Sequence, residues 1–311
     1  MRIQYSRLPT EKPNPRSRTL DRLTPLQIVA LMNREDKHAV KAVGRARRQI
    51  ARGIALISRT LAVGGRLFFV GAGTSGRLGV LEAAECPPTF NTTPSQVQAL
   101  MAGGRGAVFR SREGAEDRES EARRLVRARV RAGDVVVGIA ASGVTPFVRA
   151  ALAEAKRRRA RRILVACNAE SPLTRLADLV IAVRVGPEVL TGSTRLKAGS
   201  ATKMTLNMLT TASMVQLGKV YGNWMVDLRP NSKKLKARAL RLIEQLGRVS
   251  SVEAHHYLAR AHGRAKAAIV MARTGEGYDQ ALRKLAESHD SLRVCLKRAK
   301  PSEKSGQIGS P

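Results

Sequence analysis

The sequence predicts an α/β protein built on a doubly wound parallel sheet, and three observations point to this fold class. Short strands without polar alternation recur along residues 66–185, and helical segments separate them. Glycine-containing turns with hydroxyl side chains follow two of these strands. Parallel sheets are covered by helices on both faces, so their strands are apolar throughout. Right-handed crossovers then place a ligand site at the carboxyl ends of the strands.

The expected elements follow the chain in order. From Pro25 to about Ala62, apolar residues at helical spacing predict two or more helices that lead into the main domain. The expected strands are Arg66–Val70, Val97–Ala102, Asp134–Ala140, Ile163–Cys167 and Leu179–Val185. The expected helices begin near Gly76 and span Glu116–Arg131, Thr145–Arg159 and Leu196–Leu217. Beyond Ser232 the pattern changes to short helices, with a capping box formed by Ser250 and Glu253.

Composition divides the chain into four parts. We expect an N-terminal arm and helices over residues 1–54, the α/β domain over 55–230 and a C-terminal helical region over 231–300. The polar tail over 301–311 is expected to be disordered. The three cysteines lack CxxC spacing, which favours free thiols in a reducing compartment. Neither a signal peptide nor a membrane span is recognised, so we expect a cytoplasmic protein with no membrane partner.

The net charge is unusual, because 56 Lys and Arg oppose 24 Asp and Glu to give +32. Such an excess is typical of proteins that bind nucleic acid, and it also occurs on a merely solvated surface. The densest run, Lys156–Arg162, lies where a helix should end before a strand, and no aromatic residues interleave to stack bases. We therefore do not expect a nucleic-acid partner, although the charge should attract an anionic substrate.

The first strand ends in the turn Gly71–Gly76 (GAGTSG), which matches the dinucleotide-binding pattern G-x-G-x-x-G. A dinucleotide site also needs an acidic residue at the end of the second strand, and residues 97–109 contain none. Thr74 and Ser75 instead place hydroxyls beside the free amides of a helix N-terminus. That combination favours a terminal phosphate over a nicotinamide cofactor.

The third strand is followed by a similar turn. Ser142, Gly143 and Thr145 precede another helix, with Pro146 near its first turn. Two such turns at neighbouring strand ends can converge on one phosphate. The alternative is that each hydroxyl only caps its helix, which contributes about 1 kcal/mol.

Two acidic clusters supply candidate acid/base groups. Glu82 and Glu85 lie on the first helix, and Glu113, Glu116 and Asp117 follow the second strand. One carboxylate from each cluster could act as general acid and general base on a bound sugar, or the acids could only stabilise helix dipoles. The residues alone do not decide between a catalytic role and a purely structural role for these acids. The five histidines have no Cys or carboxylate at ligand spacing, so we expect neither a metal nor a cofactor.

The blocks around these residues resemble the N-acetylmuramic acid 6-phosphate etherases. The resemblance runs from about Thr10 to the C-terminal helices. It rests on Val70–Phe90, EGAED (113–117), GIAASGVTPF (138–147), GPEVLTGSTRLKAGSATK (186–203) and GKVYGNWMVDL (218–228).

The resemblance implies a sugar isomerase (SIS) domain, a flavodoxin-like three-layer structure that binds a sugar phosphate. A three-helix region follows, and two chains form a homodimer without metal or cofactor. It further implies that Glu85 is the proton donor, that Glu116 is the second acid/base residue, and that Ser75, Ser142 and Thr145 match phosphate-binding hydroxyls. The implied reaction eliminates D-lactate and then adds water.

This chain departs from the family pattern at three positions: Glu82 stands where Asp is expected, Asn91 where Gly is usual, and Arg118 where an acid is common. Two other functions share the domain. A non-catalytic sugar-phosphate regulator, like the glucokinase regulatory protein, carries two tandem SIS domains on a chain about twice as long. A sugar-phosphate aldose–ketose isomerase lacks the ECPPTF and EGAED blocks.

Overall fold

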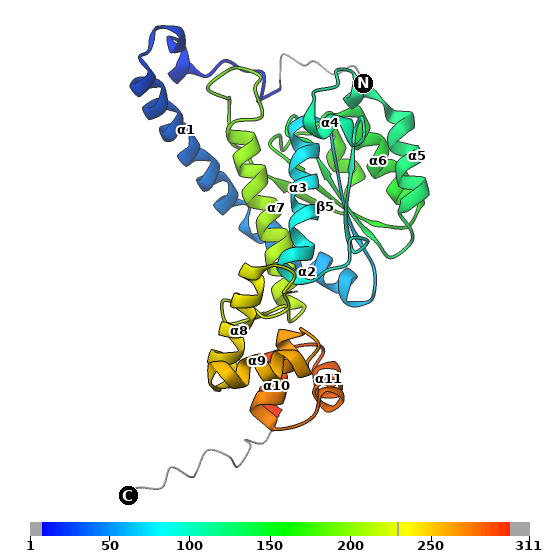
Figure 1. Cartoon of the computed structure of the whole chain (residues 1–311). Helices are drawn as coiled ribbons and strands as arrows, with labels where there is room; N and C mark the ends of the chain where they lie inside the picture. Colours follow the sequence, from blue (N-terminus) through cyan, green and yellow to red (C-terminus); the bar gives the residue numbers. More distant parts are fainter. Residues whose placement is uncertain (1–7, 229, 299–311) are drawn as a thin grey trace, which may run out of the picture. The chain divides into compact units, whose positions relative to one another are not determined.

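The computed structural model describes residues 8–228 and 230–298, so the predicted tail over 301–311 lies outside the described residues. The chain forms two compact units. Of the described residues, the first unit contains 8–85 and 93–213, and the second contains 86–92, 214–228 and 230–298. Figure 1 shows the large sheet and most long helices in the first unit, and mainly short helices in the second.

The first unit is built on a five-stranded parallel sheet, as the sequence predicts. Its strands follow the order β2-β1-β3-β4-β5, which is the flavodoxin-like order. The direction of winding reverses between β1 and β3, so a ligand crevice is expected beyond their carboxyl ends. The strands are β1 (Leu67–Gly71), β2 (Val97–Met101), β3 (Val135–Ile139), β4 (Arg161–Ala166) and β5 (Leu179–Ala182).

Strands β1 and β3 are buried on both faces, because helices cover both sides of the sheet. Phe68 and Val70 belong to the core that packs against α5 (Glu119–Arg129) and α6 (Pro146–Arg157). Phe69 points to the opposite face, where α3 (Gly73–Phe90) lies close. A Cβ on Gly79 of α3 would lie 2.8 Å from the Cβ of Phe69, so glycine allows this close packing.

Further long helices of the first unit lie on the same face of the sheet as α3. The predicted helical stretch before the sheet is confirmed as α1 (Pro25–Arg45) and α2 (Arg47–Ala62). Helix α2 lies between β5 and α7 (Lys197–Gln216), because a Cβ on Gly53 would meet side chains of both. Short elements are η2 (Pro15–Ser17), η3 (Leu20–Arg22), α4 (Gly106–Phe109), η4 (Ala115–Asp117) and η5 (Pro172–Leu176).

One predicted helix begins later than expected. The sequence pattern places Glu116 at the start of a helix, but α5 begins at Glu119 and Glu116 lies in the single turn η4. Gly114 has a φ of 68°, and Arg118 has non-helical φ and ψ values of −78° and 75°. These two residues separate η4 from the loop before it and from α5 after it.

The second unit contains a short hairpin and five helices among the described residues, where the resemblance implies three. Residues with positive φ, including Arg248 and Gly275, end the helices and divide the region into short pieces. The predicted capping box is confirmed, because Ser250 and Glu253 each accept a hydrogen bond from the other's backbone. The elements are β6 (Val220–Tyr221), β7 (Trp224–Met225), α8 (Lys233–Gly247), α9 (Ser251–Arg260), α10 (Ala265–Thr274), α11 (Tyr278–Glu287) and α12 (Leu292–Arg298).

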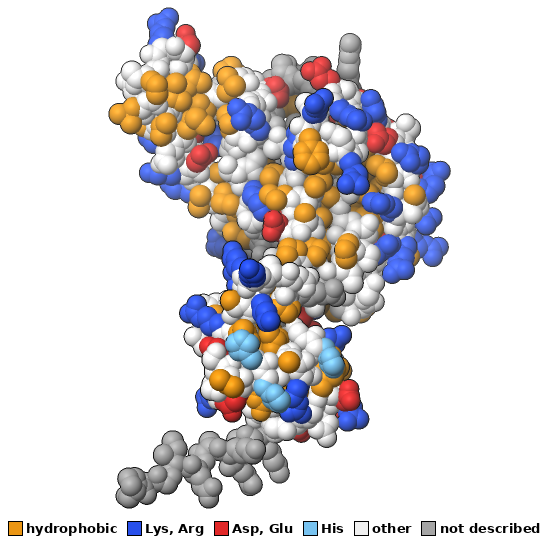
Figure 2. Space-filling view, viewed as in Figure 1, with side chains coloured by type: hydrophobic (Ala, Val, Ile, Leu, Met, Phe, Trp, Pro, Cys, Tyr) orange, Lys and Arg blue, Asp and Glu red, His pale blue; other side chains and the backbone are white. Residues whose placement is uncertain are grey.

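Much of the positive charge lies on the helices that cover one face of the sheet. Figure 2 shows Lys and Arg side chains gathered over the side of the first unit where Figure 1 labels α5 and α6. Two of the acids there are already paired: Glu119 binds two arginines, and Glu154 binds two others. The other arginines of this surface are exposed to solvent, including Arg124, Arg129 and Arg158.

The three cysteines, Cys86, Cys167 and Cys295, are buried, and no disulfide joins them. Burial raises the pKa of the Cys167 thiol to about 12, so this side chain stays protonated at neutral pH. Among the described residues, no helix is both long enough and apolar enough to cross a lipid bilayer.

Candidate active site

The two hydroxyl-bearing turns lie at the same edge of the sheet. Strand β1 ends at Gly71, which pairs in register with Ile139 at the end of β3. Thr74 and Ser75 lie in the first turn of α3, and Ser142 and Thr145 precede α6. The turns therefore follow adjacent strands at the switch point of the sheet, where ligands of such folds bind.

The hydroxyls of these turns are not used as helix caps. Thr145 is the N-cap residue of α6, but its side chain makes no capping hydrogen bond. The hydroxyls of Thr74 and Ser75 have no hydrogen-bond partner among the described residues. Ser142 only accepts a long hydrogen bond of 3.4 Å from the Val144 amide. All four side chains are partly exposed, so the capping alternative does not account for them.

The turn before α6 is held by the loop that follows β4. The Asn168 side-chain amide donates to the Ser142 carbonyl at 3.3 Å, and the Ser171 hydroxyl donates to the Gly143 carbonyl at 2.5 Å. Gly143 has a φ of 77°, and a Cβ there would lie 2.5 Å from the Cβ of Ser171. The sequence pattern did not predict a role for Asn168 or Ser171. Their position at the end of the next strand, at this same edge, is the signal that could have found them.

Glu116 shares a cavity with the turn Gly71–Gly76, which follows β1. This cavity, of about 240 Å³, lies between the turn after β1 and the loop after β2. It is lined by Ala72, Gly73, Arg77, Met101, Ala102, Ala107, Ser111, Arg112, Glu113, Gly114, Ala115 and Glu116. Glu116 is exposed, so its carboxylate is accessible to a ligand.

Two arginines in the wall of this cavity were not foreseen from the sequence. Arg77 donates through Nε to the Val108 carbonyl at 2.9 Å, and Arg112 donates through Nη1 to the Gly103 carbonyl at 3.2 Å. The first bond connects α3 to α4, and the second connects the Glu116 loop to the glycine turn after β2. They also place two positive charges where an anionic ligand would enter.

The two acids on α3 have different surroundings. Glu82 is buried and accepts hydrogen bonds from Lys203 at 2.5 Å and from Thr210 at 2.6 Å, both on α7. The Glu82 carboxylate therefore joins α3 to α7, and both of its oxygens already accept hydrogen bonds. Glu85 is exposed, which leaves it as the α3 carboxylate available for chemistry.

Within one chain, Glu85 lies far from the phosphate turn. It follows Gly73 by 12 residues in α3, a separation of about 18 Å along the helix axis at 1.5 Å per residue. Glu85 also does not line the cavity that contains Glu116. One chain therefore brings Glu116 to the first turn, but it does not bring Glu85 there.

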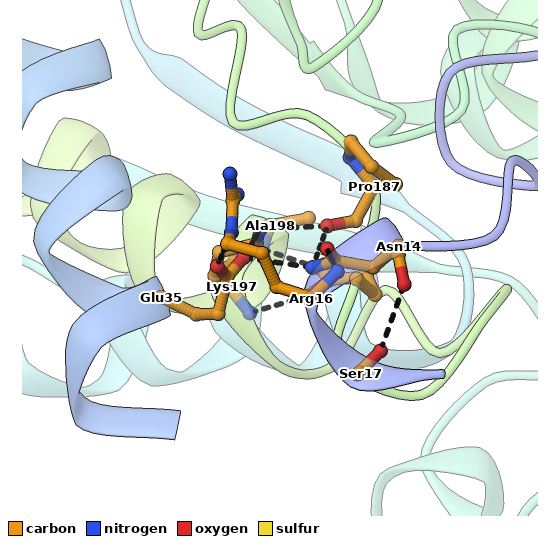
Figure 3. Close-up of polar contacts among 8 residues, drawn as sticks. Asn14, Arg16, Ser17, Glu35, Pro187, Lys197 and Ala198 are labelled. Carbon is orange, nitrogen blue, oxygen red and sulfur yellow. Dashed lines mark hydrogen bonds and ion pairs between the residues drawn. The ribbon is translucent and has the colours of Figure 1, made fainter. Parts of the chain in front are cut away.

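A buried ionic network fixes the start of α7 next to the first turn (Figure 3). Glu35 of α1 accepts hydrogen bonds from Asn14 at 2.8 Å, from Lys197 at 2.5 Å, and from Arg16. Lys197 is 1% exposed and also donates to the Pro187 carbonyl at 2.6 Å. Figure 3 shows these side chains converging from α1, α7 and the N-terminal segment.

Glu188 completes this network. Its carboxylate accepts from the backbone amides of Lys197 and Ala198, at 3.0 and 2.8 Å. Burial raises the pKa of Glu188 in spite of these two bonds. Gly199 follows Lys197 by two residues on α7. A Cβ on Gly199 would lie 3.7 Å from Cγ2 of Thr74. The network thus holds α7 beside the phosphate turn.

Among the described residues, no group of three or more His, Cys, Asp and Glu side chains is arranged to hold a metal ion. The groups that the sheet edge offers are hydroxyls, amides, guanidinium groups and carboxylates. Hydroxyls, amides and guanidinium groups bind phosphate, and carboxylates transfer protons.

Two family models match the central part of this chain. The model of the glucokinase regulatory protein N-terminal SIS domain matches residues 49–156, and the SIS domain model matches residues 116–212. A phosphoheptose isomerase from Francisella tularensis has a similar fold, with a TM-score of 0.51 and 16% identity. That similarity covers 62% of this chain and 100% of that chain.

Curated relatives match almost the whole chain. The N-acetylmuramic acid 6-phosphate etherase of Gloeothece citriformis is 48% identical over 93% of this chain and 95% of the relative. Those of Geobacillus thermodenitrificans and Mycolicibacterium smegmatis are also 48% identical, over 93% and 94% of this chain and 98% and 99% of the relatives. The chain, with its SIS fold, therefore belongs to the N-acetylmuramic acid 6-phosphate etherase family.

Proposed function

We propose that this chain cleaves the D-lactyl ether of N-acetylmuramic acid 6-phosphate to give N-acetylglucosamine 6-phosphate and D-lactate. It would act in the cytoplasm, in the recycling of cell-wall amino sugars. The observation that carries the proposal is 48% identity to curated etherases over more than nine-tenths of the chain. The free hydroxyls and the exposed Glu116 at one sheet edge are the groups that this reaction needs.

The phosphate of the sugar would bind at the switch point. Thr74, Ser75, Ser142 and Thr145 offer hydroxyls, and the first turn of α3 offers backbone amides that have no intrahelical acceptor. Gly143, whose φ is 77°, allows the tight turn that carries Ser142 and Thr145. Arg77 and Arg112 add positive charge nearby.

The chemistry would be an elimination followed by a hydration. In the open-chain aldehyde, a base removes the proton from C2, the C2–C3 double bond forms, and the C3–O bond to lactate breaks. Glu85 would protonate the departing lactyl oxygen, and Glu116 would act as the second acid/base residue. Water then adds to the unsaturated aldehyde, with its hydroxyl on C3 and its proton on C2.

The geometry of α3 favours a site made by two chains. A sugar phosphate held at the start of α3 is too short to reach Glu85 of the same helix about 18 Å away. Leu81 is 40% exposed, and Leu81 and Glu85 lie four residues apart on one helix face. On α7, Met208 is 44% exposed. We propose that a homodimer covers the exposed side chains of Leu81 and Met208 and supplies Glu85 of one chain to the phosphate turns of the other.

The direct test is to incubate the full chain with N-acetylmuramic acid 6-phosphate and to assay D-lactate. We expect stoichiometric release of D-lactate and of N-acetylglucosamine 6-phosphate. Tight binding of the substrate without any lactate would instead favour a non-catalytic sugar-phosphate regulator. The match to the regulatory-protein SIS model keeps that function as the second candidate.

Gly143→Ala should weaken substrate binding strongly. The added Cβ would lie 2.5 Å from the Cβ of Ser171, and alanine at a φ of 77° costs about 1–2 kcal/mol. We expect KM for the substrate to rise by roughly tenfold or more, because the turn must move. Gly133→Ala is the matched control, since its φ is 85° but a Cβ there meets nothing within 4 Å. An equal rise of KM in both variants would argue against the phosphate role of the turn.

A further inference from the structure

Two shallow hollows lie along the solvent face of α5, the face opposite to its buried Ala122 and Val126. The first, of about 480 Å³, is lined by Gly103, Gly104, Arg112, Arg118, Ser120, Glu121 and Arg124. The second, of about 440 Å³, is lined by Ser120, Arg123, Arg124, Arg127 and Ala128. Because Ser120 and Arg124 line both, the hollows are continuous, and we call them together the arginine groove.

The arginine groove meets the cavity that contains Glu116. Arg112 lines the first hollow and also that cavity, so its guanidinium stands between them. The hydrogen bond from Arg112 to the Gly103 carbonyl holds the side chain in this place. A Cβ on Gly106 would lie 2.5 Å from Nη2 of Arg112, so glycine leaves the room that the guanidinium occupies.

The positive charge of the groove is least compensated where it meets the cavity. Arg118 and Arg124 are exposed, and neither side chain makes a hydrogen bond or ion pair with residues 8–228 or 230–298. Of the side chains that line the first hollow, three are arginines and one, Glu121, is an acid. Figure 2 shows basic side chains gathered over this side of the first unit.

The far end of the groove is more nearly neutral. Arg123 pairs there with Glu119, and Arg127 pairs with Glu154 at 3.2 Å. The positive potential therefore increases along α5 toward the Glu116 loop. A cleft that is lined by one sign of charge raises the local concentration of the opposite ion and accelerates its association.

The proposed substrate is strongly anionic. Its phosphate carries about −1.5 to −2 charges at neutral pH, and the lactyl carboxylate adds another. The groups that would hold the phosphate at the sheet edge are uncharged hydroxyls and amides, which act only at contact distance. Long-range attraction must therefore come from charges outside that contact site, and the groove supplies them beside the cavity.

We propose that the arginine groove captures the anionic substrate and guides it into the cavity that contains Glu116. The groove sets the rate of association, and the turns at the sheet edge then hold the phosphate. This inference rests on the proposed function, because it takes that sugar phosphate as the ligand. It also gives part of the large positive charge of the chain a role in the reaction.

The test is the double variant Arg118→Glu with Arg124→Glu, assayed in the full chain at two salt concentrations. At about 10 mM salt, where charges act over about 30 Å, we expect kcat/KM to fall by roughly tenfold while kcat stays the same. At about 1 M salt, where the range is about 3 Å, variant and wild type should have nearly equal kcat/KM.

Arg48→Glu with Arg52→Glu is the matched control. Both arginines are exposed on α2, which packs against β5 at the other end of the sheet, and the change in net charge is the same. We expect this control to keep most of its kcat/KM at low salt. An equal loss in the two double variants, or a loss that persists at 1 M salt, would overturn the proposal.

A second measurement separates the groove from the reaction. The association rate of N-acetylglucosamine 6-phosphate, taken from ³¹P NMR line shapes, does not depend on turnover. It should be lower in the groove variant than in the control at low salt. If the chain released no D-lactate, the proposed function would fail, and these line shapes would still decide whether the groove guides a sugar phosphate.

Discussion

Replacing Glu116 with glutamine is expected to lower the rate of D-lactate release by roughly 10²- to 10⁴-fold, the usual contribution of a general acid or base. Glutamine keeps the size and hydrogen bonding of glutamate but cannot transfer the proton. Since Glu116 is exposed in its cavity, the substitution should leave the fold intact. The measurement is kcat under saturating substrate, with Asp117→Asn as a neighbouring acid that does not line the cavity.

Glu85→Gln should lower kcat by a similar factor, but the two variants should differ in the exchange of the C2 proton with solvent. If Glu85 protonates the leaving oxygen and Glu116 removes the C2 proton, Glu85→Gln still allows C2 exchange with deuterium from solvent. Glu116→Gln should lose both exchange and lactate release. Exchange that survives in Glu116→Gln and disappears in Glu85→Gln would reverse the two roles.

Mixing the two inactive variants tests whether the site spans two chains. In a heterodimer, one site would combine Glu116 of the first chain with Glu85 of the second, and it would be intact. Random pairing should therefore restore about a quarter of the wild-type activity. If both glutamates act from the same chain, every site in the mixture lacks one of them, and no activity returns.

The largest effect on stability is expected from Glu35→Gln. This change leaves Lys197 buried beside a neutral side chain, and breaking one half of a buried pair costs about 3–5 kcal/mol. In a unit of this size the melting temperature should fall by roughly 10 °C. Calorimetry checks this, and Glu35→Gln with Lys197→Met should recover part of the loss because no unpaired charge remains. A double variant no more stable than the single one would contradict this account.

The same carboxyl gives stability a defined pH dependence. Burial favours the neutral form of Glu35, but hydrogen bonds from Arg16, Lys197 and Asn14 outweigh burial and lower its pKa from 4.5 to about 2. The folded form therefore binds this proton less readily than the unfolded chain. The contribution is present above pH 4.5 and is lost as the pH falls toward 2. The contribution of Glu188 to the pH dependence of stability has the opposite sign, because its raised pKa favours the folded state at low pH.

Urea unfolding at several pH values separates these contributions. The wild type should lose stability between pH 4.5 and pH 2 more steeply than Glu35→Gln, which has no carboxyl at this position. Parallel pH profiles for the two proteins would show that Glu35 is not the group responsible.

The sheet and its phosphate turns could be predicted from the sequence because their signals are local. Strands buried on both faces have no polar alternation, and Gly143 with its neighbouring hydroxyls forms a recognisable turn. The acids were harder to assign. Glu82 and Glu85 look equivalent in the sequence, and only the contacts of Glu82 with α7 distinguish them.

Long-range pairing could not be foreseen. Lys197 and Glu35 are 162 residues apart, and neither lies in a pattern that names its partner. The break between η4 and α5 depends on the backbone angles of Gly114 and Arg118, which the helical spacing of apolar residues does not reveal. Asn168 and Ser171 act on the Ser142 turn only because β4 lies next to β3.

The network around Glu35 has a practical consequence for handling the protein. Two of its donors, Asn14 and Arg16, come from the segment before the first long helix. Proteolytic clipping that removes Arg16 would withdraw both donors from Glu35, and the loosened carboxylate would no longer hold Lys197 at the start of α7. Recombinant forms of the protein should therefore keep the segment that contains Asn14 and Arg16.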